Sequence, residues 1–176
     1  FSLRHGAQFV LLGSSPELGI NNEFWHLKHH LNESPDCHLE IGYDEELAHL
    51  IYSGADLIVV PSNFEPCGLT QMIALRYATV PVVRGVGGLL DTVFDRDYSE
   101  KPPSERNGYM FYEGDYTALE SALERALRLW FARPGEFRQL ILNGMRYDYN
   151  LPRFYSRPLE ASMKMLQKYL RTTNAI

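Results

Sequence analysis

Short apolar runs alternate along this chain with longer segments whose apolar residues recur at helical spacing. Most of the short runs are rich in Val, Ile and Leu and are flanked by turn-forming residues, which is typical of buried strands in a parallel sheet. They predict strands at 8–12, 38–43, 56–60 and 80–83, and an edge strand at 107–112. The periodic segments predict helices at 21–31, 44–53, 69–77, 116–131, 134–147 and 158–170.

The ends of these elements carry recognisable signals. We expect Asn21 or Asn22 to cap the first helix and Asp44 to cap the second, since side-chain oxygens of Asn and Asp accept hydrogen bonds from the first turn. Pro134 suits the first turn of a later helix. The polar segment 95–107 contains two prolines and predicts a mobile surface loop.

The strict alternation of strands and helices predicts an α/β fold: a Rossmann-like parallel sheet with helices on both faces. Ligands of such sheets bind at the carboxyl ends of the strands. Four segments fall at these ends, namely 13–15, Tyr43, 65–68 and 85–89. We therefore expect four loops to meet at one edge of the sheet.

The stretch 61–84 carries the strongest chemical signal. A strand ending at Val60 is followed by Glu65, a Pro-Cys-Gly turn and the start of an amphipathic helix. Backbone amides at Gly68, Leu69 and Thr70 would be unpaired at the positive end of the helix dipole, which favours an anion such as phosphate. Glu65 would repel a phosphate, so we expect it to face a neutral, hydroxyl-rich group. Phosphate and polyol together indicate a nucleotide sugar.

The segments FEPCGLTQ, ALRYATVPVVR and GGLLDTVFD closely resemble the carboxy-terminal half of bacterial glycogen synthases and plant starch synthases. The resemblance extends over 8–149, and the form DTVFDRD is closer to plant starch synthases of classes III and IV. It implies the second lobe of a GT-B fold and a retaining glucosyltransferase that lengthens α-1,4-glucan from ADP-glucose. It also implies starch biosynthesis in a plastid, and no metal or other cofactor.

The resemblance assigns roles to residues around the motif acid. Tyr43 precedes Glu65 by 22 residues, the interval that separates the base-stacking aromatic from that acid in the family. Stacking on Tyr43 suits adenine and uracil alike, so UDP-glucose stays open, and by residue habit alone Tyr43 would simply pack on a neighbour. Glu65 would contact the transferred glucose and support positive charge at its anomeric carbon. Cys67 would lie close to the sugar as a small packing residue, without a nucleophilic role.

A second set of residues would hold the phosphate and complete the pocket. By resemblance, Leu69 and Thr70 donate backbone amides to the distal phosphate, where charge develops as the leaving group departs. Gly87 and Gly88 match the second glycine-rich loop of the family, near donor and acceptor. The two preceding residues, 85 and 86, are Gly and Val where the family has a basic residue and Thr, and this weakens the case for full activity.

Composition narrows the classes of partner. The chain has 176 residues and a formal net charge of -5, which argues against nucleic acid or an anionic membrane as a partner. No apolar run is long enough to span a bilayer. Two distant cysteines indicate a reducing compartment. A metal site at His26, His29, His30 and Glu23 is spatially conceivable on a helix, but an exposed His-rich face is the favoured interpretation.

For domain organisation we expect one nucleotide-sugar-binding lobe at 1–150, with its first strand and helix missing, and a carboxy-terminal helix at 151–176 that packs on this lobe or towards an absent partner lobe. The chain would then be a piece of a longer synthase, bind nucleotide, and lack elongation activity alone because the other lobe completes the glucan acceptor groove. The alternative is a catalytically retired lobe that serves as a scaffold for a protein partner.

Overall fold

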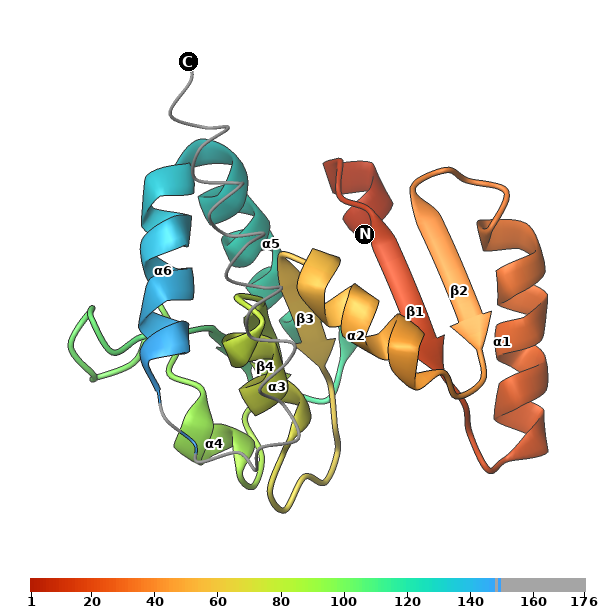
Figure 1. Cartoon of the computed structure of the whole chain (residues 1–176), viewed down its shortest axis with the longest axis horizontal. Helices are drawn as coiled ribbons and strands as arrows, with labels where there is room; N and C mark the ends of the chain where they lie inside the picture. Colours follow the sequence, from red (N-terminus) through yellow and green to blue (C-terminus); the bar gives the residue numbers. More distant parts are fainter. Residues whose placement is uncertain (148, 150–176) are drawn as a thin grey trace. The chain divides into compact units, whose positions relative to one another are not determined.

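The computed structural model describes residues 1–147 and 149. The chain forms two compact units, Phe1–Ile51 and Tyr52–Ile176 (Figure 1). The lobe predicted at 1–150 thus comprises two compact parts. The helix predicted at 158–170 and the packing expected of 151–176 lie outside the described residues.

The first unit is built on one pair of strands. Its elements are the 3₁₀ helix η1 (Ser2–His5), β1 (Phe9–Gly13), α1 (Leu18–Leu31) and β2 (Cys37–Ile41). The strands are parallel, with Phe9 opposite Cys37, and α1 packs beside β2. Asn32, just after α1, ties the helix to the strand, because its side chain accepts a hydrogen bond from Leu39 N–H and donates one to Leu39 C=O.

The second unit contains a three-stranded parallel sheet. Its strands β3 (Leu57–Val60), β4 (Val80–Arg84) and β5 (Tyr109–Phe111) lie in the order β3-β4-β5. Among its described residues, this unit contains the helices α3 (Thr70–Arg76), α4 (Leu89–Thr92), α5 (Tyr116–Ala132) and α6 (Pro134–Arg146). Helix α2 (Glu45–Gly54) crosses the division between the units. All five predicted strands are present, and every strand pair is parallel.

Side chains on both faces of this sheet are buried. On β4, Val82 belongs to a core cluster shared with α5 and α6, whereas Val83 belongs to a second cluster with Leu89 of α4. On β5, Tyr109 joins the first cluster and Met110 the second. Since successive strand side chains point to opposite faces, the two clusters lie on opposite sides of the sheet. The prediction of a sheet covered on both faces is confirmed for this unit.

Two of the predicted helix ends are confirmed and one is wrong. Asp44 accepts a hydrogen bond from Leu47 N–H (2.9 Å), and Pro134 opens α6. Helix α1, however, begins at Leu18, before the predicted Asn caps. Asn21 instead fixes the preceding loop, because it accepts from Ser15 N–H (2.8 Å) and donates to Ser15 C=O.

An ion-pair network is buried at one end of the second sheet. Arg125 of α5 donates to both carboxylate oxygens of Asp95 (3.0 and 3.1 Å), to Asp97 (2.9 Å) and to Met110 C=O (2.9 Å). Its guanidinium also lies 5.2 Å from the ring centre of Tyr109. Burial raises the pKa of the Tyr109 hydroxyl far above its ordinary value.

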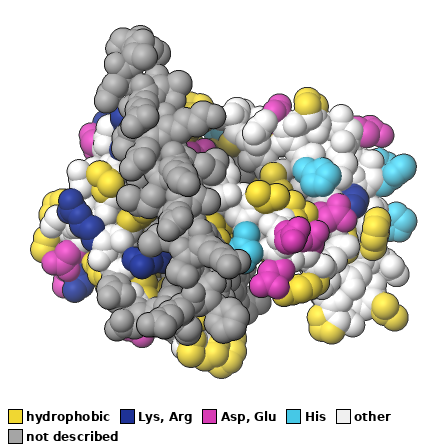
Figure 2. All heavy atoms as spheres, viewed as in Figure 1, with side chains coloured by type: hydrophobic (Ala, Val, Ile, Leu, Met, Phe, Trp, Pro, Cys, Tyr) yellow, Lys and Arg dark blue, Asp and Glu magenta, His cyan; other side chains and the backbone are white. Residues whose placement is uncertain are grey.

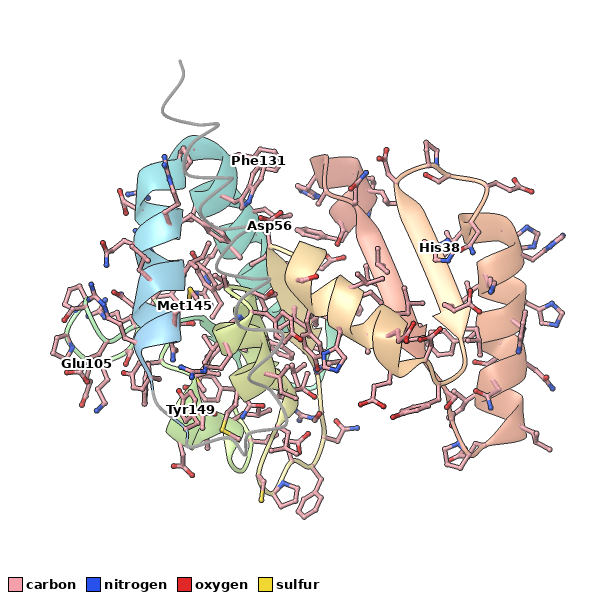
Figure 3. All side chains as sticks on the ribbon, viewed as in Figure 1. His38, Asp56, Glu105, Phe131, Met145 and Tyr149 are labelled. Carbon is pink, nitrogen blue, oxygen red and sulfur yellow. The ribbon has the colours of Figure 1, made fainter. Side chains whose placement is uncertain are left out.

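The loop 95–107 lies at the surface as predicted, but the prediction of mobility overlooked its anchors. Asn143 of α6 donates to Pro103 C=O (2.9 Å) and Arg106 C=O (3.0 Å). Tyr147 donates its hydroxyl to the backbone carbonyl of Glu105 (2.8 Å), the residue labelled at the loop in Figure 3. These hydrogen bonds hold the loop against α6, and nothing in the local polarity of the segment indicates them.

Candidate functional site

The candidate site lies at the carboxyl ends of β3 and β4. These parallel neighbours are followed by two loops, 61–69 before α3 and 85–88 before α4. Both loops therefore emerge at the same edge of the sheet, as predicted for this unit. Each of them contains a glycine with positive φ, Gly68 (69°) in the first and Gly87 (48°) in the second.

Glu65 is half-buried and is held by its own loop. One carboxylate oxygen accepts a hydrogen bond from Gly68 N–H (3.1 Å), and the other accepts from the Ser62 hydroxyl (3.2 Å). The carboxylate is thus fixed beside the start of α3 and does not point into the core. The prediction of an unpaired amide at Gly68 is therefore wrong, because Glu65 accepts its hydrogen bond. The role of Glu65 towards glucose stays a prediction.

The second loop supports the first through close backbone contact. Gly88 N–H donates to Glu65 C=O (2.9 Å). A Cβ atom at Gly87 would lie 2.0 Å from the carbonyl oxygen of Glu65, and one at Gly88 would lie 2.4 Å from that of Cys67. Only glycine allows this approach, so these two glycines are needed for packing whether or not they also contact a ligand.

Gly68 lies against a buried glutamine. A Cβ atom at Gly68 would be 2.5 Å from Nε2 of Gln71, whose side chain is fully buried. Gln71 Nε2 donates to the Thr92 hydroxyl (2.9 Å), which donates to Gly88 C=O (2.8 Å). Helix α4 is itself contacted by Tyr149, labelled in Figure 3, which donates its hydroxyl to Thr92 C=O (2.8 Å).

Leu69 and Thr70 stand where the sequence placed them, at the beginning of α3. Thr70 is the first residue of this seven-residue helix, and Leu69 precedes it with an exposed side chain (56%). The first amides of a helix have no intrahelical partner, which leaves these two available to an anion. Whether they bind phosphate stays a prediction.

Cys67 is exposed, so it does not contribute to the core, and its predicted place close to the sugar stays a prediction. Gly88 of the second loop lies against the backbone of Cys67, not against its thiol. Among the described residues, the buried cysteine is Cys37 of β2, where burial raises the pKa of the thiol.

The glycine at position 85 has a structural explanation. A Cβ atom at Gly85 would lie 2.5 Å from the ring of Tyr112, so that ring occupies the space that a side chain at position 85 would need. The adjacent Arg84 spans the edge of the sheet, because it donates to Asn63 Oδ1 and to Tyr112 C=O (3.2 Å). A cation is thus present one position earlier, but it is engaged in loop contacts.

Tyr43 belongs to the first unit and follows β2 by two residues. Its side chain is 86% exposed, so the alternative that it packs on a neighbour is not realised in this structure. An exposed aromatic ring at the carboxyl end of a strand is available for stacking. Its role towards a base stays a prediction.

The histidines of α1 do not form a metal site with other residues. His26, His29 and His30 are exposed, and Figure 2 shows histidine side chains at the surface of this unit. Within 1–147 and 149, no three His, Cys, Asp or Glu side chains are arranged to hold a metal ion. In the same part of the chain, no helix has the length and apolarity to cross a membrane.

Four residues of the site were missed by the sequence reasoning: Ser62, Gln71, Arg84 and Thr92. Gln71, Arg84 and Thr92 lie within FEPCGLTQ, ALRYATVPVVR and DTVFD, and Ser62 lies three residues before Glu65. Their partners lie up to 28 residues away in sequence, so composition and spacing alone did not reveal them.

Comparisons with known proteins find similar sequences and folds among glycogen and starch synthases. The chain is 65% identical over 150 residues to glycogen synthase 1 of Trichormus variabilis, covering 85% of this chain and 30% of that protein. The catalytic domain of starch synthase IV from Arabidopsis thaliana, bound to ADP and acarbose, matches with a TM-score of 0.82 and 38% identity, covering 94% of this chain and 34% of that one. No protein-family model matches the chain.

Anabaena HepE in complex with UDP-glucose has a TM-score of 0.58 at 12% identity and covers 98% of this chain and 43% of that one, which supports the fold alone. The chain spans about a third of the length of the synthases it matches. These matches confirm the predicted α/β fold class and do not favour the scaffold alternative. Over the matched residues, the chain is a homologue of bacterial glycogen synthases and shares the fold of part of a plant starch synthase catalytic domain.

Proposed function

We propose that this chain is the donor-binding part of a retaining glucosyltransferase that takes glucose from ADP-glucose and adds it to an α-1,4-glucan. The observation that supports this most is the fixed carboxylate of Glu65 beside the exposed start of α3. A polyol can donate hydrogen bonds to the carboxylate while a diphosphate accepts hydrogen bonds from the amides of Leu69 and Thr70.

In this proposal each residue of the site has a separate role. Glu65 accepts hydrogen bonds from the transferred glucose and offsets positive charge at the anomeric carbon as the bond to phosphate breaks. The amides of Leu69 and Thr70 stabilise the negative charge that builds on the departing diphosphate. Gly87 and Gly88 hold Glu65 in place through backbone contact. Tyr43 stacks on the base.

ADP-glucose is preferred to UDP-glucose because the plant synthase that the chain resembles at 38% identity was solved with ADP. The bacterial relatives are glycogen synthases and the plant protein is a starch synthase, so the proposal names their shared chemistry, elongation of an α-1,4-glucan. A plastid location belongs to the starch version of the proposal. The groove that binds the acceptor glucan and the remaining catalytic groups would be supplied by polypeptide outside this chain.

The test uses a chimera in which these residues replace the matching 150 residues of the Trichormus glycogen synthase. Glucose transfer from ADP-glucose to glycogen is measured for the chimera and for Glu65→Gln, which keeps the shape of the side chain and removes its charge. We expect Glu65→Gln to lower kcat by about 100-fold or more with little change in ADP affinity. Asp91→Asn, an exposed acid on α4, is the matched control and should keep full activity. Unchanged transfer by Glu65→Gln would refute the proposed role.

A further inference from the structure

The side chain of Gln71 is unusual among the polar residues of the second unit. It is fully buried, and its Oε1 atom has no hydrogen-bond partner. A buried amide without all its partners is costly compared with an apolar side chain of similar size, so a purely space-filling residue would more often be Leu or Met. The position therefore calls for a role that needs the amide.

The contacts of Gln71 close a ring that includes both loops of the candidate site. From Gln71 Nε2, hydrogen bonds lead to the Thr92 hydroxyl (2.9 Å) and on to Gly88 C=O (2.8 Å). From Gly88, its N–H leads to Glu65 C=O (2.9 Å). The Glu65 carboxylate accepts from Gly68 N–H (3.1 Å), and Gly68 lies directly on the Gln71 amide.

Two links in this ring join segments that are distant in sequence, and the others are local. Gln71 and Thr92 are 21 residues apart, and Gly88 N–H of the second loop donates to Glu65 C=O of the first, where glycines let the two backbones approach. The Gln71 side chain lies beneath Gly68 while it also holds the start of α4. If the amide were lost, the Thr92 hydroxyl would no longer be oriented to donate to Gly88 C=O. Gly68 would also lose the side-chain amide against which it packs.

We infer that Gln71 is a positioning residue that fixes the Glu65 carboxylate and the amides of the α3 start relative to the second glycine-rich loop. This inference rests on the proposed function for its catalytic meaning. It adds a residue that contacts no reacting group and acts through Thr92, Gly88 and Gly68. The side chain orders two loops that would otherwise be joined by a single backbone hydrogen bond.

The experiment compares Gln71→Met, which keeps the volume and removes the amide, with Thr92→Val and Thr92→Ser. Gln139→Met, at an exposed glutamine of α6 that also hydrogen-bonds a neighbour, is the matched control. Hydrogen exchange is followed at the amides of Gly68 and Gly88, which donate to Glu65, and at Val83 in the core as reference.

We expect Gln71→Met and Thr92→Val to accelerate exchange at Gly68 and Gly88 by about tenfold or more relative to Val83. Thr92→Ser, which keeps the hydroxyl, and Gln139→Met should stay close to the unmodified chain. Unchanged exchange at the two glycines would overturn the inference. Exchange that rises equally at Val83 would also overturn it, because that result indicates global destabilisation of the unit. Thr92→Val keeps the test decisive if Gln71→Met does not fold.

A parallel titration with ADP separates this inference from the proposed function. If the unmodified chain binds ADP, we expect Gln71→Met to weaken binding by about tenfold, while Gln139→Met has no effect. If the unmodified chain does not bind ADP, the proposed function fails, whereas the exchange comparison still decides whether Gln71 orders the loops. Faster exchange with unchanged ADP affinity would contradict the positioning role.

Discussion

The two units of this chain contain similar elements but differ in how much of them is buried. In the second unit, alternate residues of β4 and β5 enter two separate core clusters on opposite faces of the sheet. In the first unit, as far as residues 1–51 are concerned, only Cys37 and Leu39 are buried, and α1 buries none of its residues. The same strand and helix patterns in the sequence thus accompany very different degrees of burial.

The loops at the strand ends differ in the same way. In the second unit, Gly87 and Gly88 allow two backbones to touch, and the Glu65 carboxylate is fixed by two hydrogen bonds. In the first unit, a Cβ atom at Gly13 would meet nothing within 4 Å, and Tyr43 is exposed. Close packing in the second unit fixes its two loops, whereas the first unit carries an exposed aromatic ring at the end of its strand.

Removal of a cation should have the largest effect on unfolding free energy, and this effect should differ clearly between the two units. Arg125→Ala leaves the carboxylate of Asp95, which is 5% exposed, without its cation, although the backbone amides of Asp97, Tyr98 and Met110 still donate to it. We expect a loss of about 3 kcal/mol in unfolding free energy. Lys28→Ala removes the corresponding ion pair with Glu40 in the first unit, where both side chains are partly exposed, and should lower the unfolding free energy far less.

Urea unfolding of both variants, followed by circular dichroism, measures this difference. Similar losses for Arg125→Ala and Lys28→Ala would contradict the distinction between a buried and a solvated unit. Arg125→Lys serves as a control that keeps the charge and loses the two-pronged geometry, and it should fall between the two.

Substitution of one glycine in each unit tests the difference between the loops. Gly87→Ala places a Cβ 2.0 Å from a backbone oxygen and at a positive φ, so we expect a loss of about 1–3 kcal/mol in unfolding free energy. Gly13→Ala meets open space and should change it by less than about 0.5 kcal/mol. Equal effects in thermal unfolding would mean that the second loop is free to move away from Glu65.

The pH dependence of stability offers a smaller test. Burial alone would raise the pKa of Asp97, but hydrogen bonds from Arg96 and Arg125 outweigh it and lower this pKa below its ordinary value. Because the folded-state pKa is the lower one, the stabilisation is present above about pH 4 and is lost as the pH falls further. Urea unfolding measures how far the unfolding free energy falls between pH 6 and pH 3. We expect this fall to be smaller in Asp97→Asn than in the unmodified chain, by about 1 kcal/mol or less. If the unfolding free energy of Asp97→Asn fell more steeply with acid than that of the unmodified chain, the lowered pKa of Asp97 in the folded state would be refuted.

The sequence predicted the elements well because strand patterns and helical spacing are local signals. All five strands, and the cap of α2 at Asp44, lie where expected within a few residues. Helix α4 has only four residues, too few to show a helical period, and it was not predicted. Asn21 was misjudged as a cap because its side chain forms a loop contact with Ser15 that the sequence does not distinguish from capping.

The position of the candidate site in the fold could be predicted from the sequence, but the contacts that support it could not. Glu65 and the start of α3 follow from a short motif, whereas the contacts of Gly87 and Gly88 depend on the distance between two backbones. Nothing in the sequence around Gln71 indicates a supporting role, because this role depends on its hydrogen bond to Thr92, which only the structure reveals. Cys67 was expected to be a packing residue because free cysteines are usually buried, but the close approach of the second loop involves its backbone.

The most direct test of the donor site is a titration of the chain with ADP, followed by calorimetry and by the amide NMR signals of the second unit. The account predicts saturable binding in the millimolar range or tighter, with the largest shifts at Gly68, Leu69 and Thr70. The absence of heat and of shifts at millimolar ADP, or shifts confined to residues away from the two loops, would contradict it.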